Sequence, residues 1–167
     1  MSRFFLRALS AATVLLGGCG SDPAKPVWAQ AQPRTIAVKM QADARLNTDA
    51  GGHSLALVAR IYMLRQNATF ERGPYDSFLS PQKEQQLLGS DLIEVKEVLL
   101  VPGQHYEVLE KVSRDANFIG VVGLFRTPAP QRWRLAFAAG QAEQSGITIG
   151  AHACALSVGA DRLPACP

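Results

Sequence analysis

The chain has 167 residues, of which 47% are hydrophobic and 19% are charged, and its formal net charge is +3. This length fits one domain better than two. Two of the 17 basic side chains, Arg3 and Arg7, belong to the signal peptide described next. The mature chain therefore has 15 basic side chains, 17 less these two, against 14 acidic ones and is close to neutral. Without a basic stripe or interleaved aromatic residues, the composition gives no basis for nucleic-acid binding.

Residues 1–18 have the pattern of a bacterial lipoprotein signal peptide. A short positive region precedes the apolar run 8–16, which is too short to span a bilayer as a helix. The run leads into Leu16-Gly17-Gly18-Cys19, which resembles a lipobox: a branched apolar residue, two small residues and a cysteine. We therefore expect cleavage before Cys19, which would carry a diacylglycerol and an N-acyl chain. The alternative is an ordinary secretory signal with an incidental cysteine.

The residue after the cysteine predicts the membrane that holds the lipid. An aspartate there would favour the inner membrane in enteric-like systems, whereas this chain has Gly20, so we expect anchoring in the outer membrane, facing the periplasm. Three acyl chains, each contributing roughly 0.8 kcal/mol per buried methylene, should keep the protein permanently attached to the membrane. Residues 19–33 are rich in Ala, Pro and Gln without an apolar period and read as a tether. We expect no other cofactor.

The chain has three cysteines, an odd number for an exported protein. If Cys19 carries lipid, Cys154 and Cys166 remain as one possible pair. A bond between them would close a short loop and contribute about 3 kcal/mol in the chain-entropy description.

The folded part, residues 34–167, begins with a strand. Residues 35–41 alternate between apolar and polar, the period of a half-buried strand. Residues 45–54 are a cluster of turn formers and predict a loop, and residues 55–64 predict a strand buried on both faces. The β pattern then stops, and Ser80-Pro81 resembles a helix start, so we expect one or two short helices in an insert at about 70–88.

The remaining chain predicts further strands. Residues 91–101 also fit helical spacing, but their length and the Pro102-Gly103 turn favour a strand. The other predicted strands are 105–112, 118–126, 132–138, 147–149 and 153–158. Seven or eight short strands with turns between them indicate a mainly β fold, an antiparallel β-sandwich, with the helical insert capping one edge or end.

Residues that could carry catalysis are few. The three histidines His53, His105 and His152 are scattered, without the spacing of metal ligands, so we expect no metal site. No nucleophile elbow, phosphate-binding loop or dinucleotide glycine pattern is present in the sequence. We therefore expect a binding or scaffold protein and not an enzyme.

Several short segments of the middle of the chain form a pattern through their order and spacing. They are Leu46-Asn47-Thr48-Asp49, Arg60-Ile61-Tyr62-Met63-Leu64, Phe70, Tyr75-Asp76, Leu87-Leu88-Gly89-Ser90-Asp91-Leu92, Leu100-Val101-Pro102-Gly103, Gly120-Val121-Val122, Phe125-Arg126 and Trp133-Arg134. Together they resemble the outer-membrane lipoprotein of the type VI secretion system, the TssJ family. The resemblance covers about residues 33–137 together with the lipobox.

The resemblance implies a transthyretin-like β-sandwich with a small helical insertion, tethered to the outer membrane. It also implies a structural role: binding the periplasmic C-terminal region of the inner-membrane subunit TssM, with the TssL subunit in the same complex, and so anchoring an envelope-spanning assembly.

In that family the loop between the first two strands is implicated in the TssM contact, and here it corresponds to residues 45–54. The loop is too short for the protruding finger of some members. The alternative is that the loop residues only close the end of the strand or form the turn. The Cys154–Cys166 pair has no counterpart in the family pattern. The candidates for contact or for loop shape are Leu46, Asn47, Asp49, Gly51, Gly52 and His53.

Two other functions remain open at the level of sequence. A lipoprotein that binds a small ligand or polysaccharide in its sandwich should have an apolar pocket with a few converging polar groups. A divergent envelope enzyme should have titratable groups clustered in a cleft. A scaffold should instead show loop surface suited to a partner.

Overall fold

The computed structural model describes residues 32–159 and residue 166. The predicted signal peptide, Cys19 and most of the predicted tether lie outside the described residues. Among the described residues no helix is both long and apolar enough to cross a membrane.

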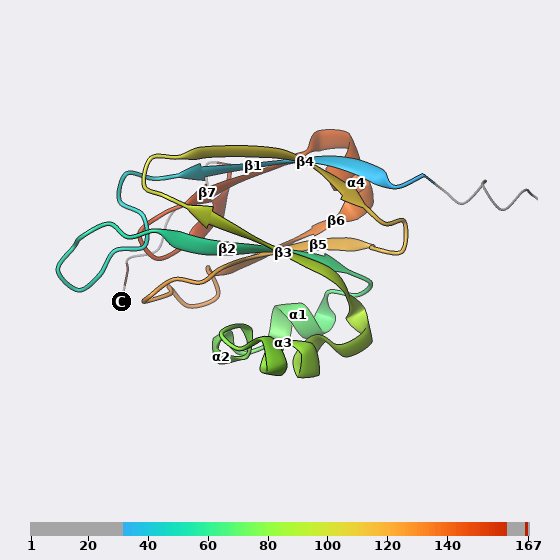
Figure 1. The fold of residues 1–167 in the computed structure, drawn as a ribbon, viewed down its shortest axis with the longest axis horizontal. Helices are drawn as coiled ribbons and strands as arrows, with labels where there is room; N and C mark the ends of the chain where they lie inside the picture. The colour runs from blue at the N-terminus through green and yellow to red at the C-terminus, as the bar shows by residue number, and fades with distance from the viewer. Residues whose placement is uncertain (1–31, 160–165, 167) are drawn as a thin grey trace, which may run out of the picture. The chain divides into compact units, whose positions relative to one another are not determined.

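Within the described part of the chain, eight strands form two four-stranded sheets that face each other (Figure 1). The first sheet has the order β4 (His105–Val112), β1 (Arg34–Ala42), β7 (Ile147–Ala151), β8 (Leu156–Val158). The second has the order β3 (Leu92–Leu100), β2 (Leu57–Leu64), β5 (Phe118–Gly123), β6 (Arg134–Ala138). The predicted β-sandwich is therefore confirmed.

One strand pair departs from the expected antiparallel arrangement: β1 and β7 are parallel, from Val38 opposite Ile147 to Ala42 opposite Ala151. The chain reaches β7 from β6, which lies in the other sheet, through the helix α4 (Ala139–Ser145). A crossover of this kind does not impose the reversal of direction that a hairpin imposes. The sequence analysis did not predict α4, because its residues carry no run of apolar positions at helical spacing.

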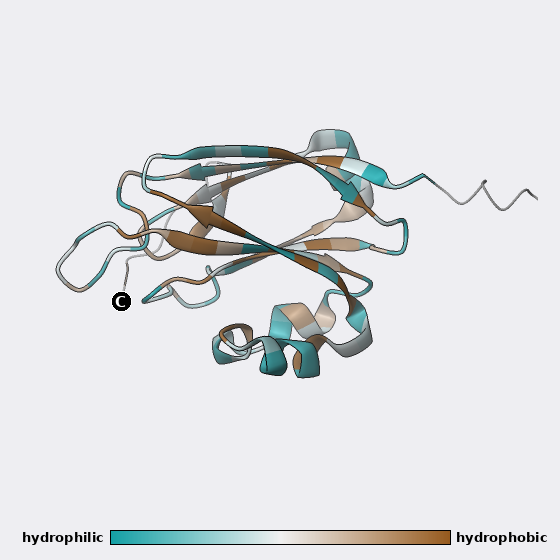
Figure 2. Cartoon of the chain, viewed as in Figure 1, coloured by the Kyte–Doolittle hydropathy of each residue, from teal (hydrophilic) through white to brown (hydrophobic). Residues whose placement is uncertain are grey.

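The space between the sheets is filled by the apolar residues of the alternating strands. In β1 the side chains of Ile36, Val38 and Met40 are at most 1% exposed, as the period-two pattern predicts. Figure 2 shows hydrophobic residues running along the strands of both sheets. β2 is buried on both faces, since Tyr62 and Leu64 are as inaccessible as Ile61. Its outer face is covered by the helical insert.

The insert has three short helices, one more than expected, and packs on the outer face of the second sheet (Figure 1). They are α1 (Ala68–Arg72), α2 (Tyr75–Phe78) and α3 (Pro81–Leu88), followed by a 3₁₀ turn (Gly89–Asp91). Ser80 precedes α3 as predicted, although its hydroxyl bonds to the side chain of Gln82 and not to the helix backbone.

An aromatic cluster attaches the insert to the sheet. The ring of Phe78 lies 5.9 Å from Tyr62, 5.5 Å from Phe70 and 5.3 Å from Trp133, measured between centroids. Phe70 also lies over Gly120 of β5, where an added Cβ would come within 2.6 Å of the ring. Gly120 is thus required for the insert to approach the sheet this closely.

A buried ion network lies beside these rings. Arg60 of β2 donates to Glu84 of α3 at 2.7 Å and to Glu97 of β3 at 2.7 Å, and the Tyr62 hydroxyl donates to the same Glu84 oxygen at 2.8 Å. Burial, together with this carboxylate, raises the pKa of Tyr62 well above its usual range. Each charge therefore has a partner, as buried charges require.

β1 separates the two ends of the sandwich. It begins with Arg34 at one end and leads to the β1–β2 loop at the opposite end (Figure 1). Nine residues at roughly 3.3 Å each make this separation about 30 Å.

Candidate partner-binding site

Four connections meet at the end of the sandwich that carries the β1–β2 loop, which we call the loop end. They are the β1–β2 loop (43–56), the β3–β4 turn (101–104), the β5–β6 loop (124–133) and the β7–β8 turn (152–155). The first two touch where Gly103 donates its backbone N–H to the carbonyl of Asp43 at 3.1 Å.

The β1–β2 loop is hydrogen-bonded along the β7–β8 turn. The backbone N–H of Asn47 donates to the carbonyl of His152 at 3.1 Å, and that of Thr48 donates to Ala153 at 3.0 Å. These bonds continue the β1–β7 pairing into the loop, so the β7–β8 turn serves as its base.

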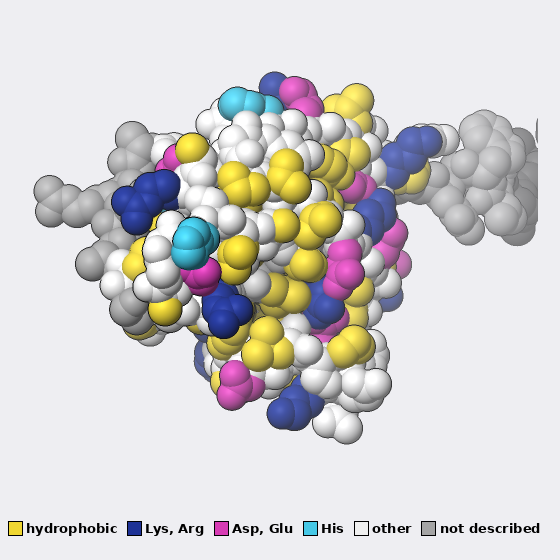
Figure 3. All heavy atoms as spheres, turned by 60° about the vertical axis from the view of Figure 1, so that its left-hand side comes forward, with side chains coloured by type: hydrophobic (Ala, Val, Ile, Leu, Met, Phe, Trp, Pro, Cys, Tyr) yellow, Lys and Arg dark blue, Asp and Glu magenta, His cyan; other side chains and the backbone are white. Residues whose placement is uncertain are grey.

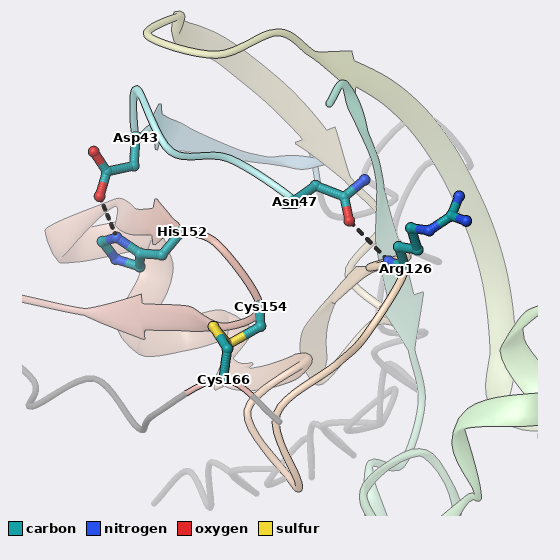
Figure 4. Close-up of a disulfide and its surroundings, with 6 residues drawn as sticks. All are labelled: Asp43, Asn47, Arg126, His152, Cys154 and Cys166. Atoms are coloured by element: carbon teal, nitrogen blue, oxygen red, sulfur yellow. Dashed lines mark hydrogen bonds and ion pairs between the residues drawn. A yellow bond between two sulfur atoms is a disulfide. The ribbon is translucent and has the colours of Figure 1, made fainter. Parts of the chain in front are cut away.

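Leu46 and Asn47 shape the loop from inside. Leu46 is 0% and Asn47 is 6% exposed. The amide of Asn47 donates to the carbonyl of Ala56 at 2.8 Å and accepts from the backbone N–H of Arg126 at 2.8 Å (Figure 4). Asn47 also has a φ of 45°, in the left-handed region that asparagine tolerates better than most residues. Of the two roles predicted for this pair, the geometry favours loop shape.

The tip of the loop is a compact turn around Asp49. Its Oδ1 accepts the backbone N–H groups of Gly51 at 2.8 Å and His53 at 2.9 Å, and its carboxylate lies 3.1 Å from the His53 ring. The His53 backbone N–H is the largest cause that holds the pKa of Asp49 below its usual value. Gly52 has a φ of 79°, and a Cβ on Gly51 would come within 2.9 Å of the His53 ring. The His53 side chain is 78% exposed, against 28% for Asp49.

The base of the loop contains a chain of three polar side chains. Asp43 lies 3.2 Å from Nδ1 of His152, whose Nε2 lies 2.9 Å from the hydroxyl of Ser157 (Figure 4 shows the first pair). Hydrogen bonding to His152 is the largest cause that lowers the pKa of Asp43. Gly150 makes room for the imidazole, since a Cβ there would lie 2.5 Å from Nε2. The three groups border a surface pocket of about 390 Å³.

This order of carboxylate, imidazole and hydroxyl is also that of a catalytic triad. In a triad, however, the carboxylate is buried and the hydroxyl faces the substrate. Here the Asp43 side chain is 50% exposed and Ser157 is 4% exposed. These three side chains are better suited to attach the start of the β1–β2 loop to β8.

A disulfide lies under the loop. Cys154 and Cys166 are bonded with their Cα atoms 5.7 Å apart, and the carbonyl of Cys154 accepts the N–H of Ala129 in the β5–β6 loop at 2.8 Å (Figure 4). Both cysteines line a pocket of about 370 Å³ between the β1–β2 loop and Thr127. The bond therefore fixes the turn on which the loop rests.

The histidines do not come together around a metal. His105 and His152 border the same pocket, whereas His53 lies at the loop tip. Within residues 32–159 and 166, no three His, Cys, Asp or Glu side chains are arranged to hold an ion.

The sequence analysis did not predict the groups that hold the loop in place through contacts between distant segments, namely Asp43 in the loop itself and Arg126 and His152 outside it. No local signal marks them, because each acts through an element more than 70 residues away, as between Asn47 and Arg126 and between Asp43 and His152. In the β7–β8 turn that supports the loop, only Cys154 carried a recognisable signal in the sequence.

Residues 34–154 match the model of the family described as type VI secretion lipoprotein, VasD, EvfM, TssJ. The chain belongs to this family. The matched residues run from the first residue of β1 to Cys154, so the second half of the disulfide lies beyond them. No curated protein sequence matches the chain.

Solved structures share the fold. A chain of a structure described as "Type VI membrane complex" is 27% identical, covers 80% of this chain and 100% of its own length, and has a TM-score of 0.69. The type VI lipoprotein TssJ1 from Pseudomonas aeruginosa is 25% identical, with coverage of 79% and 99% and a TM-score of 0.67. A chain of a structure described as the TssM C-terminal domain (869–1107) from EAEC is 28% identical, with coverage of 79% and 99% and a TM-score of 0.64. These matches confirm the predicted fold.

Proposed function

We propose that this protein is the outer-membrane lipoprotein of a type VI secretion system, that it binds the periplasmic C-terminal region of TssM through its loop end, and that the lipid on Cys19 anchors the resulting complex, which also contains TssL. Membership of the type VI secretion lipoprotein family is the observation that carries the proposal.

One of the similar structures supports the choice of partner. The chain matched in the structure described as the TssM C-terminal domain is covered over 99% of its length by 79% of the 167 residues here. The matched chain is therefore much shorter than the TssM segment 869–1107. We infer that it is a companion of the TssM domain in that structure, with the fold of this protein.

The geometry of the domain supports the same arrangement. The first residue of β1, next to the predicted tether, and the loop end lie at opposite ends of a strand about 30 Å long. A domain held from the first end presents the loop end away from the membrane. This placement suits a protein that connects a membrane to a partner across the periplasm.

The experiment that tests the contact replaces residues 48–53 with a neutral linker and measures binding to the purified periplasmic region of TssM. We keep Leu46 and Asn47 because both are buried. The expected result is a loss of binding of at least about tenfold, as for a surface that contains binding hot spots, with an unchanged melting temperature. A double substitution on the surface of α3, Lys83→Ala with Gln86→Ala, is the control and should leave binding intact.

The anchor is tested with Cys19→Ser. This variant should fold and bind the TssM region in solution, but should no longer co-fractionate with the outer membrane or support secretion. Normal secretion by the unlipidated protein would contradict the anchoring role.

A further inference from the structure

The charges of the loop end are unevenly paired. The two acidic side chains of the β1–β2 loop, Asp43 and Asp49, each lie against a histidine. Two exposed basic side chains, Arg45 in this loop and Arg126 in the β5–β6 loop, make no ion pair within the described residues. Arg126 is held beside the loop by its backbone bond to Asn47 (Figure 4), which leaves its guanidinium available.

Most basic side chains elsewhere in the described domain already have acidic partners. The pairs are Arg34 with Glu143, Lys39 with Glu107, Arg60 with Glu84 and Glu97, Arg65 with Asp115, Lys96 with Glu94 and Glu110, and Arg114 with Glu143. Arg45 and Arg126 thus place two exposed cations without an acidic partner at the proposed contact. Elsewhere in the described domain four basic side chains also make no ion pair, namely Arg72, Lys83, Lys111 and Arg134.

Apolar surface adjoins these charges. Leu99 is 61% and Val101 is 48% exposed. Leu99 of β3 is paired with Val58, the second residue of β2, which lies close to the end of the β1–β2 loop. Figure 3 shows exposed hydrophobic side chains spread over this face of the molecule, with basic and histidine side chains among them. Exposed branched apolar side chains grouped in this way are typical of protein interaction surfaces.

We propose that the loop end binds an acidic surface of its partner, with carboxylates opposite Arg45 and Arg126 and apolar side chains opposite Leu99 and Val101. This inference rests on the proposed function and adds the chemistry of the partner's contact surface. An apolar centre with a charged rim is the usual composition of such an interface, and arginine is favoured in it. Complementary charge at the rim acts mainly on the association rate, and salt weakens it.

Charge reversal tests the inference. Arg45→Glu with Arg126→Glu should slow association with the periplasmic region of TssM about tenfold at 50 mM NaCl, and the difference from the unsubstituted protein should shrink at 300 mM NaCl. Lys111→Glu is the control for a single reversal outside the loop end. Lys111 is exposed on β4, opposite Thr35 near the start of β1, and its reversal should change the rate by less than about twofold.

The apolar half is tested separately with Leu99→Ser, which should increase the dissociation rate about fivefold or more at both salt concentrations. Circular dichroism should show that every variant is folded. If the unsubstituted protein does not bind the TssM region at all, the proposed function fails. If it binds, and the arginine reversals behave like Lys111→Glu, the acidic-surface inference is wrong while the proposed function stands.

Discussion

The loop end and the helical insert both lie outside the two sheets, but they are attached in different ways. The insert is attached through buried rings, with Phe70 and Phe78 0% exposed, and through the Arg60–Glu84 pair. The β1–β2 loop is attached through backbone hydrogen bonds, through the Asn47 amide and through a turn fixed by a disulfide. The insert therefore belongs to the core.

The difference shows how one domain can be both rigid and available for binding. A segment that buries its apolar side chains in its own sheet has little left to offer a partner. The loop end instead buries only Leu46 and Asn47 of the predicted contact residues and keeps His53 exposed. Its shape is set before a partner arrives, which reduces the entropy lost on binding.

The largest expected effect concerns the insert. Phe78→Ala removes a fully buried ring that contacts three aromatic neighbours, and we expect it to lower the free energy of unfolding by about 4 kcal/mol. Chemical denaturation measures this change. Binding of the TssM region by the folded fraction should be unaffected, and a loss of affinity as large as that of the loop replacement would break the distinction between the two regions.

The disulfide comes next. Its cysteines are separated by 12 residues, and Cys154→Ser with Cys166→Ser should lower the free energy of unfolding by about 3 kcal/mol. Hydrogen exchange should accelerate at residues 45–54 and remain slow in the insert at residues 68–88. Equal acceleration in both segments would show that the bond stabilises the whole domain and does not act on the loop in particular.

Asn47 separates backbone conformation from hydrogen bonding. Asn47→Ala loses two side-chain bonds and leaves a residue with a Cβ at a φ of 45°, so we expect a destabilisation of about 2 kcal/mol. Asn47→Gly loses the same bonds without the left-handed strain and should be about 1 kcal/mol less harmful. Thermal unfolding of both variants measures the difference. If the two variants have the same melting temperature, the side-chain hydrogen bonds of Asn47, and not its backbone conformation, explain why asparagine stabilises the fold at this position.

The smallest effect is pH-dependent. The bond to His152 holds the pKa of Asp43 below its ordinary value of 3.8. A carboxyl group with a lowered folded pKa stabilises the fold above its unfolded pKa and loses that contribution as the pH falls through the folded pKa. Asp43→Asn, at this half-exposed position, should lower the free energy of unfolding by less than about 0.5 kcal/mol at pH 7. The difference from the unsubstituted protein should disappear as the pH falls below the lowered pKa of Asp43 in the folded protein, and a difference that persists there would contradict this origin.

Strand positions were predictable where the sequence carried an alternating or a continuous apolar pattern. The alternation at residues 35–41 gave β1, and the continuous apolar run at 55–64 gave a strand covered on both sides, as observed for β2. The same signal was weaker where the pattern was short. The strand expected at 153–158 begins only at Leu156, because residues 152–155 form the turn to which the loop is bonded.

The candidate site was predictable in position and only partly in detail. The turn formers at 45–54 located the loop, but they did not distinguish Leu46 and Asn47, which are buried, from His53, which is exposed. That distinction depends on Arg126 and the β7–β8 turn, which lie far away in the chain. The parallel pairing of β1 and β7 was likewise not predictable, since period-two patterns carry no information about the partner strand or its direction.

The sequence by itself determined the features that depend on neighbouring residues: the lipobox at Cys19 as an expected attachment point, the alternation of the strands, and the ordered segments by which the family was recognised. The tertiary structure alone decided which side chains face solvent at the loop end. Exposure there results from segments as distant as Asn47 and Arg126 packing together, and packing between distant segments leaves no periodic mark on either of them.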